Sequence, residues 1–186
     1  MKKKNSTFTV ENEIRKYKKP MTTKFKGDKV VTTNGNLPKE GDMALSFSAC
    51  GLDLQDAKLD DFKGSRIILN IFPSVDTGVC AASVRRFNQE AASLENTKVL
   101  CISKDLPFAQ GRFCGAEGIE NVVMLSVFRD NSFQDAYGLL MIDGPLKGLL
   151  ARAVVVIDEN GKVVYRELVP EITQEPDYEK ALASLR

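Results

Sequence analysis

The 186-residue chain contains no histidine and no tryptophan. Without an imidazole it cannot form a Ser/His or Cys/His catalytic pair, a histidine metal site or a histidine haem ligand. Its 26 Lys and Arg residues nearly balance its 25 Asp and Glu residues, so the net charge gives no overall field that would attract a polyanion. Most hydrolytic and metal chemistry is therefore excluded, and nucleic acid is not an expected partner.

Long apolar runs are also missing. No stretch approaches the ~20 residues that a membrane-spanning helix needs, so no membrane partner is expected. Residues 1–20 carry seven basic and two acidic side chains and lack the apolar stretch of a secretory signal. We expect them to be a disordered basic extension, with a weak tether to an anionic surface as the alternative. Residues 21–186 contain no repeat or low-complexity linker, which predicts a single domain.

Cysteine is sparse but present, as Cys50, Cys80, Cys101 and Cys114. Their gaps of 30, 21 and 13 residues leave no Cys-x-x-Cys pair, which argues against a thioredoxin-type redox motif and against paired zinc ligands. At 43% hydrophobic composition the chain can bury a core without disulfide staples. Reduced or redox-active thiols are therefore expected, and together with the missing secretory signal they predict a cytoplasmic protein.

The strongest strand signal is the nearly unbroken apolar run Arg66–Phe72, which is typical of a central strand covered on both faces. A β-hairpin is expected before it, with strands at residues 22–26 and 30–33 around Gly27 and Asp28. The other expected strands are Phe47–Leu54, Lys98–Ile102, Val122–Val127, Ala153–Ile157 and Lys162–Leu168.

Helical spacing follows the central strand. Val84, Phe87, Ala91 and Leu94 recur at intervals of three and four residues, which predicts a helix ending near Asn96. Three further helices are expected, from Pro107 to residues 115–118, at Ser132–Tyr137, and from Pro176 onward. Strands and helices thus alternate before a final antiparallel pair. This order predicts an α/β protein with a mixed central sheet, helices on both faces and an N-terminal β-hairpin.

Cys80 lies in the opening turn of the helix that follows the central strand. In an α/β sheet this junction is at the carboxyl edge, where ligands bind. Unpaired N–H groups and the positive end of the helix dipole stabilise a thiolate there, and the thiolate is the nucleophile. Thr77 can offer a hydroxyl to the same space, and Pro73 stiffens the loop. The alternative is structural, with Cys80 as a small buried hydrophobe and Thr77 as a helix cap.

The segment from Pro73 to Cys80 fits the signature P-x-x-x-T-x-x-C and resembles the peroxiredoxins. Five segments in order narrow the resemblance to the thiol peroxidase subgroup, the atypical two-cysteine enzymes. These segments are Leu69–Pro73, Cys80–Arg85, Asp105–Gln110, Arg112–Gly118 and Asp143–Leu149. The resemblance covers residues 22–186 and implies a thioredoxin-like fold.

The resemblance implies a role for each matching residue. Cys80 corresponds to the peroxidatic cysteine, whose thiolate attacks a hydroperoxide and becomes a sulfenic acid. Thr77 corresponds to the threonine that hydrogen-bonds the thiolate and the peroxide, and Pro73 to the proline that shields the site from water. Arg152 corresponds to the arginine that stabilises the thiolate and the charge developing on the peroxide oxygens; taken alone, it could equally be a surface arginine at a strand end. Cys114 corresponds to the resolving cysteine, which forms an intramolecular disulfide with Cys80.

The implied function is that of a thiol-dependent peroxidase that reduces hydrogen peroxide and organic hydroperoxides, is recycled by thioredoxin and forms a homodimer. This chemistry needs no metal and no organic cofactor. Backbone N–H groups, Thr77 and Arg152 can stabilise the negative charge as it moves from the attacked oxygen to the leaving oxygen. The alternative function is a thioredoxin-fold redox sensor, in which oxidation of Cys80 and Cys114 is relayed to a partner without turnover.

The spacing of the two cysteines predicts a conformational change. If the second helix starts at Pro107, Cys114 lies about 10 Å along its axis, whereas a disulfide needs Cα atoms within about 7 Å. We therefore expect the reduced protein to hold Cys80 and Cys114 apart. Formation of the bond then requires unwinding of one or both helices.

The remaining candidates carry less information. Cys50 and Cys101 are expected to be structural residues, because free cysteine packs as a small hydrophobe. A group of apolar residues after the third helix either lines a collar for alkyl hydroperoxides or belongs to ordinary core and interface packing. This group is Leu139, Leu140, Met141 and Leu149.

Overall fold

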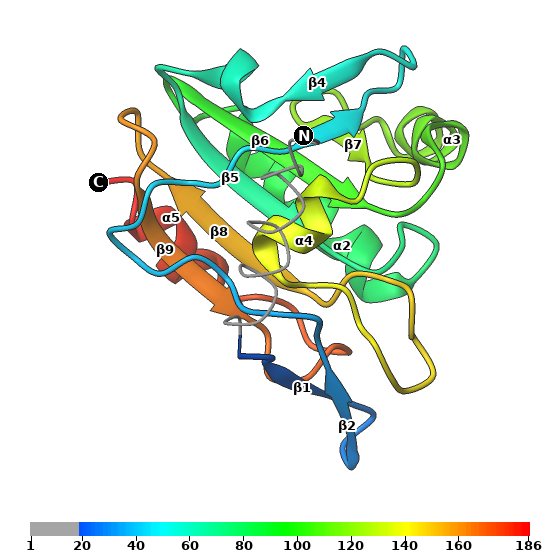
Figure 1. The fold of residues 1–186 in the computed structure, drawn as a ribbon. Coiled ribbons are helices and arrows are strands. Elements are labelled where there is room, and N and C mark those ends of the chain that lie inside the picture. The colour runs from blue at the N-terminus through cyan, green and yellow to red at the C-terminus, as the bar shows by residue number, and fades with distance from the viewer. Residues whose placement is uncertain (1–18) are drawn as a thin grey trace, which may run out of the picture.

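The computed structural model describes residues 19–186, drawn in Figure 1. The prediction for residues 1–20 lies outside this range, apart from Lys19 and Pro20. A seven-stranded sheet forms the centre, in the order β4-β3-β7-β6-β5-β8-β9. Its strands are β3 (Ser48–Cys50), β4 (Asp56–Lys58), β5 (Arg66–Ile71), β6 (Thr97–Ser103), β7 (Val123–Ser126), β8 (Ala153–Ile157) and β9 (Val163–Leu168).

The sheet is mixed, as the sequence predicts. Strands β5, β6 and β7 run parallel to one another, whereas β8 runs antiparallel to β5 and β9 antiparallel to β8. On the other edge, β3 and β4 are also antiparallel. Every side chain of β5 from Ile67 to Ile71 is buried, because this strand has neighbours on both edges and helices or loops over both faces.

Helices cover both faces of the sheet, which confirms the predicted architecture. They are α2 (Gly78–Ala91), α3 (Pro107–Glu117), α4 (Ser132–Tyr137) and α5 (Tyr178–Ala183). Figure 1 shows α4 on the near side and α2 and α5 on the far side. The far-side core joins Val84 and Phe87 of α2 to Ile68 of β5. The near-side core contains Phe133 of α4, whose ring lies edge-on to Phe47 at a centroid distance of 5.0 Å.

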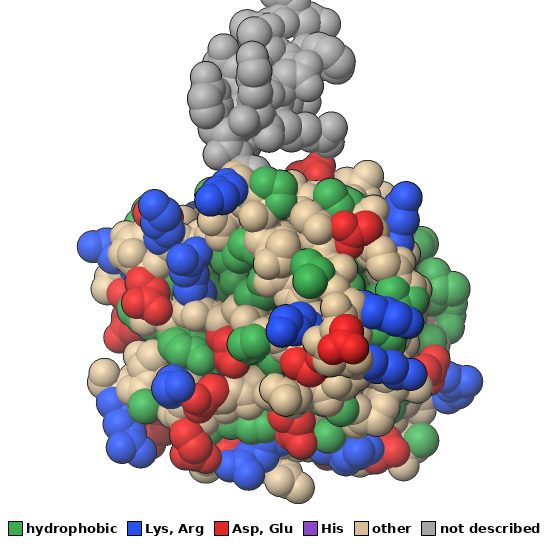
Figure 2. Space-filling model, turned by 90° about the horizontal axis from the view of Figure 1, so that it is seen from below, with side chains coloured by type: hydrophobic (Ala, Val, Ile, Leu, Met, Phe, Trp, Pro, Cys, Tyr) green, Lys and Arg blue, Asp and Glu red, His purple; other side chains and the backbone are tan. Residues whose placement is uncertain are grey.

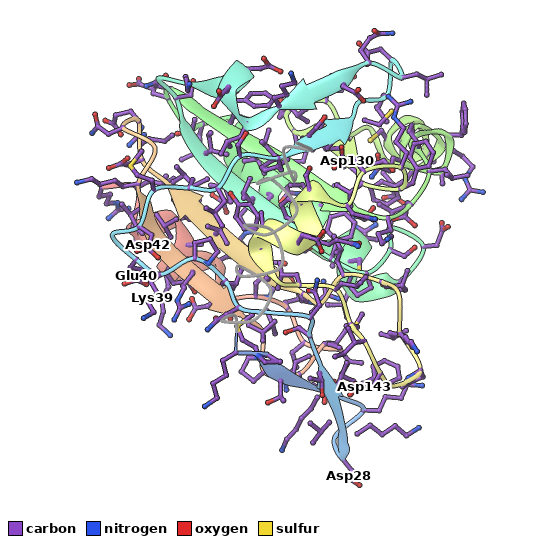
Figure 3. All side chains as sticks on the ribbon, in the orientation of Figure 1. Asp28, Lys39, Glu40, Asp42, Asp130 and Asp143 are labelled. Carbon is purple, nitrogen blue, oxygen red and sulfur yellow. The ribbon has the colours of Figure 1, made fainter. Side chains whose placement is uncertain are left out.

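The predicted N-terminal hairpin is present as β1 (Thr22–Phe25) and β2 (Lys29–Thr32). Figure 3 shows Asp28 at its tip and Asp143 beside β2. The backbone N–H of Thr32 donates to the Asp143 carboxylate at 2.7 Å. The hairpin is therefore held to a loop more than one hundred residues further along the chain.

A second carboxylate holds the turn of the hairpin. Lys26 and Gly27 both have left-handed backbone, with φ of 53° and 83°. Their N–H groups donate to the carboxylate of Glu171 at 3.0 and 2.9 Å. The bond from Gly27 has the largest effect on this carboxylate. Together with bonds from the N–H and hydroxyl of Thr173 and from Lys26, it lowers the pKa of Glu171 to about 2.

The expected single strand Phe47–Leu54 is wrong. Strand β3 ends at Cys50, and the chain turns back through Leu54, whose φ of 66° is left-handed, to form β4. A 3-10 helix, η1 (Leu59–Phe62), follows at once. The apolar pattern does not report such a turn, because a leucine in left-handed backbone has no local sequence signal.

Two predicted helix ends also differ. Helix α2 ends at Ala91 rather than near Asn96, although Leu94 still packs against the core from the turn that follows. The last helix begins at Tyr178 rather than at Pro176, because the carboxylate of Asp177 accepts the N–H of Lys180 at 3.0 Å and caps it there.

The surface carries both signs of charge. On the face shown in Figure 2, Lys and Arg side chains alternate with Asp and Glu, so this face has no extended patch of one sign. Within residues 19–186, no helix is long and apolar enough to cross a membrane. The same residues contain no group of three or more His, Cys, Asp or Glu side chains placed to hold a metal ion.

Candidate active site

Cys80 is positioned by the junction of β5 and α2. Strand β5 ends at Ile71, the buried Pro73 opens the connecting loop, and α2 begins at Gly78. Cys80 is thus the third residue of the helix, and it has no exposed surface. The first-turn N–H groups of a helix have no intrahelical partner, so the sulfur lies at the positive end of the α2 dipole.

Arg152 reaches the same place from the other side of β5. Because β8 is antiparallel to β5 and pairs Ala153 with Ile71, the residue before β8 lies at the carboxyl end of β5. The Nη2 of Arg152 donates to the Sγ of Cys80 at 3.2 Å, and its Nε donates to the carbonyl of Ile172 at 2.9 Å. The side chain is only 2% exposed. The structure therefore places Arg152 in the buried site and not at the surface.

One donor of this guanidinium is left over. Nη1 of Arg152 is buried and has no hydrogen-bond partner among the described residues. A buried donor without a partner is costly, and a buried guanidinium is stable only beside an anionic or strongly accepting group. An ionised sulfur at Cys80 and an oxygen of a bound molecule would satisfy both requirements.

Thr77 precedes the first residue of α2 but does not cap the helix with its side chain. Its hydroxyl donates to the carbonyl of Ser74 at 3.1 Å, and its backbone N–H donates to the same carbonyl at 3.2 Å. Since its proton is used in this way, the hydroxyl oxygen can only accept a further hydrogen bond. Thr77 is exposed, so that acceptor is within reach of a molecule entering from solvent.

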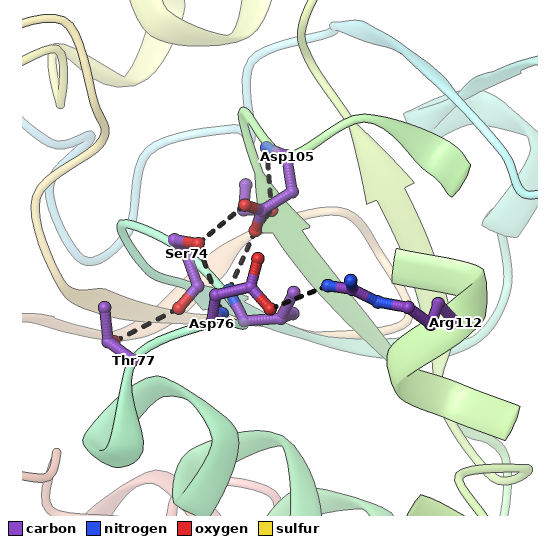
Figure 4. A network of polar contacts seen from close by, with 7 residues as sticks. Ser74, Asp76, Thr77, Asp105 and Arg112 are labelled. Atoms are coloured by element: carbon purple, nitrogen blue, oxygen red, sulfur yellow. Dashed lines mark hydrogen bonds and ion pairs between the residues drawn. The ribbon is translucent and has the colours of Figure 1, made fainter. Parts of the chain in front are cut away.

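A network of polar contacts holds the loop between Pro73 and Thr77 (Figure 4). The carboxylate of Asp105, just after β6, accepts hydrogen bonds from Ser74 Oγ at 2.7 Å and from the N–H of Val75 at 2.8 Å. Asp76 forms an ion pair with Arg112 of α3 at 3.0 Å. The sequence includes Asp105 in a family segment but predicts no role for it, because nothing local in the sequence shows which loop its carboxylate contacts.

Cys114 lies at the start of the last turn of α3, seven residues after Pro107, as the sequence predicts. It is half-buried, and burial raises the pKa of its thiol. Both Cys80 and Cys114 are free in this structure. Cys114 packs against the same far-side core that contains Cys80, but it is held within an intact helix.

The other two cysteines are buried in strands. Cys101 of β6 has no exposed surface, and burial raises the pKa of its thiol to about 12, although a weak hydrogen bond from Asn70 opposes this effect. Cys50 of β3 is 1% exposed. Of the expected collar, Leu139 and Met141 are fully buried core residues. The other two members, Leu140 and Leu149, are half-buried.

Fold and site together define a class of protein. A thioredoxin-like mixed sheet carries a cysteine at a helix start, and a buried arginine donates to its sulfur. This combination is that of a thiol-based redox protein of the peroxiredoxin type.

Comparison with known proteins agrees with this class. The Redoxin family model matches residues 39–182. A thiol peroxidase from Corynebacterium glutamicum is 58% identical over 163 residues, which cover 88% of this chain and 98% of that protein. Among solved structures, a peroxiredoxin-like protein from Aquifex aeolicus is 42% identical with a TM-score of 0.82, over 87% of this chain and 94% of that one.

A thiol peroxidase from Chromobacterium violaceum, at 24% identity and a TM-score of 0.80 over 88% of this chain and 94% of that one, shares the fold. The chain belongs to the Redoxin family, and within it to the thiol peroxidases of the peroxiredoxin group. It is a peroxidase.

Proposed function

We propose that the protein reduces hydrogen peroxide and organic hydroperoxides through Cys80, with Thr77, Arg152 and Pro73 completing the site. The observation that carries this proposal is the hydrogen bond of 3.2 Å from Arg152 Nη2 to Cys80 Sγ, between two buried side chains. A guanidinium at this distance favours the thiolate, which is the nucleophilic form of cysteine.

In the first step, the thiolate of Cys80 attacks one oxygen of the hydroperoxide. An S–O bond forms, the O–O bond breaks, and the second oxygen leaves as an alkoxide or hydroxide that takes up a proton. Cys80 becomes a sulfenic acid. The unpaired Nη1 of Arg152 stabilises the negative charge on the oxygens, the hydroxyl oxygen of Thr77 accepts the O–H of the substrate, and buried Pro73 keeps water away.

In the second step, Cys114 attacks the sulfur of the sulfenic acid. An S–S bond forms and water leaves, which gives the intramolecular disulfide. Since Cys114 lies in the last turn of α3 and Cys80 in the first turn of α2, the step requires local unwinding of one or both helices. After oxidation of Cys80, α2, α3 or both therefore have to unwind locally before the disulfide can form.

Thioredoxin, or another dithiol protein of that type, then reduces the disulfide and returns both thiols. A cytoplasmic location suits this cycle because it depends on a supply of reduced thiol. We further propose that residues 21–186 act as a single domain and that two copies form a homodimer. The family resemblance supports these assignments.

The test is a thioredoxin-coupled assay that follows NADPH consumption with hydrogen peroxide and with an alkyl hydroperoxide. Many turnovers are expected for the native chain, and none for Cys80→Ser. Intact mass after one equivalent of peroxide should show the loss of two hydrogens, mapped to Cys80 and Cys114. A single equivalent of oxidation without turnover would contradict the proposal and favour a redox sensor.

A further inference from the structure

Asp105 holds two elements together at the carboxyl edge of the sheet. Its carboxylate accepts three hydrogen bonds: from Ser74 Oγ at 2.7 Å, from the N–H of Val75 at 2.8 Å and from Ser103 Oγ at 2.7 Å. Two of these donors belong to the loop that leads to Cys80, and the third ends β6. An ionised carboxylate is the one side chain of this size that can accept all three bonds at once.

Ser74 links Asp105 to Thr77 through hydrogen bonds. Its side chain is fixed by Asp105, while its backbone carbonyl accepts both the hydroxyl and the N–H of Thr77. The N–H of Asp76 also donates to Ser74 Oγ at 3.2 Å. Thr77 therefore takes its orientation from Ser74, and Ser74 takes its orientation from Asp105 (Figure 4).

The sheet side of the network is rigid. Ser103 is fully buried and also accepts a hydrogen bond from Gln110 Nε2 of α3 at 3.1 Å, and the same nitrogen donates to the carbonyl of Leu125 in β7. The backbone carbonyl of Asp105 accepts Ser126 Oγ. Asp105 is thus hydrogen-bonded to β6 and β7 on one side and to the loop between β5 and α2 on the other.

We propose that Asp105 is a positioning residue for the reaction of Cys80 with hydroperoxide, acting through Ser74 on Thr77. It does not touch the substrate. It holds the Thr77 oxygen where the O–H of the hydroperoxide can donate to it, and misplacement of a reacting group by about 1 Å can cost on the order of a hundredfold in rate. The inference rests on the proposed function of Cys80 and Thr77.

The experiment compares two reactions of Cys80 in the reduced full-length chain. Stopped-flow oxidation by hydrogen peroxide needs both the thiolate and Thr77, whereas alkylation by iodoacetamide needs the thiolate alone. For Asp105→Ala we expect peroxide oxidation to slow about tenfold or more, with no fall in the alkylation rate. Asp105→Asn keeps one acceptor for the N–H of Val75 and Ser103 Oγ, so it should restore part of the peroxide rate.

A double-mutant cycle distinguishes positioning of Thr77 from general loosening of the loop. In a Thr77→Val background, Asp105→Ala should slow peroxide oxidation by less than about threefold, because the group that it positions is already gone. If the two effects multiply, Asp105 does not act through Thr77 and the inference is overturned. If Asp105→Ala fails to fold, Ser74→Ala in the same cycle removes the same link.

A matched control is Asp158→Asn. Asp158 also holds a turn through two backbone N–H groups, those of Asn160 and Lys162 at 2.9 and 2.8 Å, but it lies in the β8–β9 turn. In Asp158→Asn, the rate at which hydrogen peroxide oxidises Cys80 should equal that of the native chain. If Cys80 of the native chain does not react with peroxide, the proposed function is refuted. If the native chain reacts with peroxide but Asp105→Ala reacts at the same rate, only this inference is refuted.

Discussion

Arg152 and Cys80 lie 72 residues apart in the chain and meet at 3.2 Å, with both side chains buried. The contact depends on the antiparallel direction of β8, which brings the residue before this strand to the carboxyl end of β5. A parallel strand in the same place would begin at the opposite edge of the sheet. The site is therefore built by topology as much as by the loop that carries the cysteine.

Removal of this guanidinium should lower the reactivity of Cys80. For Arg152→Met we expect alkylation of Cys80 at pH 7 to slow about tenfold or more, because the positive charge that lies against the sulfur is gone. The measurement is the rate of reaction with iodoacetamide at pH 7. Arg66→Met is the matched control, since the Arg66 guanidinium, like that of Arg152, donates to backbone carbonyl oxygen, but it has no hydrogen bond to a described cysteine. Equal rates in the native chain and in Arg152→Met would rule out the role of Arg152.

The two thiols whose pKa values are raised by burial should be labelled in a defined order. Because the pKa of Cys101 is about 12 and the residue has no exposed surface, it should stay unmodified in the native protein at pH 8. Half-buried Cys114 should react slowly, and both should react at once in denaturant. Mass spectrometry of proteolytic peptides gives the order. Fast labelling of Cys101 in the native protein would show that β6 opens more readily than this structure implies.

Glycine in α3 should control the second step of the proposed cycle. Gly115 is next to Cys114, and a Cβ added there would meet nothing within 4 Å, so close packing does not require a glycine. Gly115→Ala should stabilise the helix by about 0.5–1 kcal/mol. Disulfide formation should then slow roughly two- to fivefold if α3 must unwind, while the oxidation of Cys80 keeps its rate.

Quenched-flow intact mass separates these two steps, and hydrogen exchange supplies the control. Reduced Gly115→Ala should show greater protection in α3 than the native chain. Protection of α2 and α3 should fall on oxidation in both proteins. An unchanged rate of disulfide formation together with raised protection would mean that α3 stays folded during the step.

The stabilisation by Glu171 should depend on pH. Its pKa falls from 4.5 to about 2 in the folded protein, so its contribution to stability is complete above about pH 4.5 and is lost as the pH falls toward 2. Glu171→Gln should therefore lower Tm at pH 7 and lower it less at pH 2.5. Thermal unfolding at both pH values measures this. Glu159→Gln, in the β8–β9 turn, serves as the control, and an equal loss at both pH values would disprove the linkage.

The central strands and the main helices were predictable because their signals are local. The apolar run of β5 and the three-and-four spacing in α2 reflect burial directly. The family resemblance implies one site for Cys80 and Arg152, and the structure brings the two together. The position of Arg152 in the site was predicted from the family resemblance and not from the local sequence around this residue.

The rest depends on contacts that local patterns do not contain. Leu54 takes left-handed backbone only because the turn between β3 and β4 demands it, and α2 ends early although Leu94 remains in the core. Asp105 holds a loop thirty residues earlier in the chain. The polar residues around Asp105 are typical of an ordinary turn. Its contact with the loop after β5 follows only from the pairing of β5 with β6.

The late arrival of Arg152 has a consequence during synthesis. The ribosome releases Cys80 72 residues before it releases Arg152, and β8 has to emerge as well before it can add to β5. Until then the growing polypeptide carries Cys80 without the guanidinium that donates to its sulfur in the folded protein. If Cys80 reacts as proposed, we expect unfinished chains to react slowly with peroxide until β8 has paired with β5.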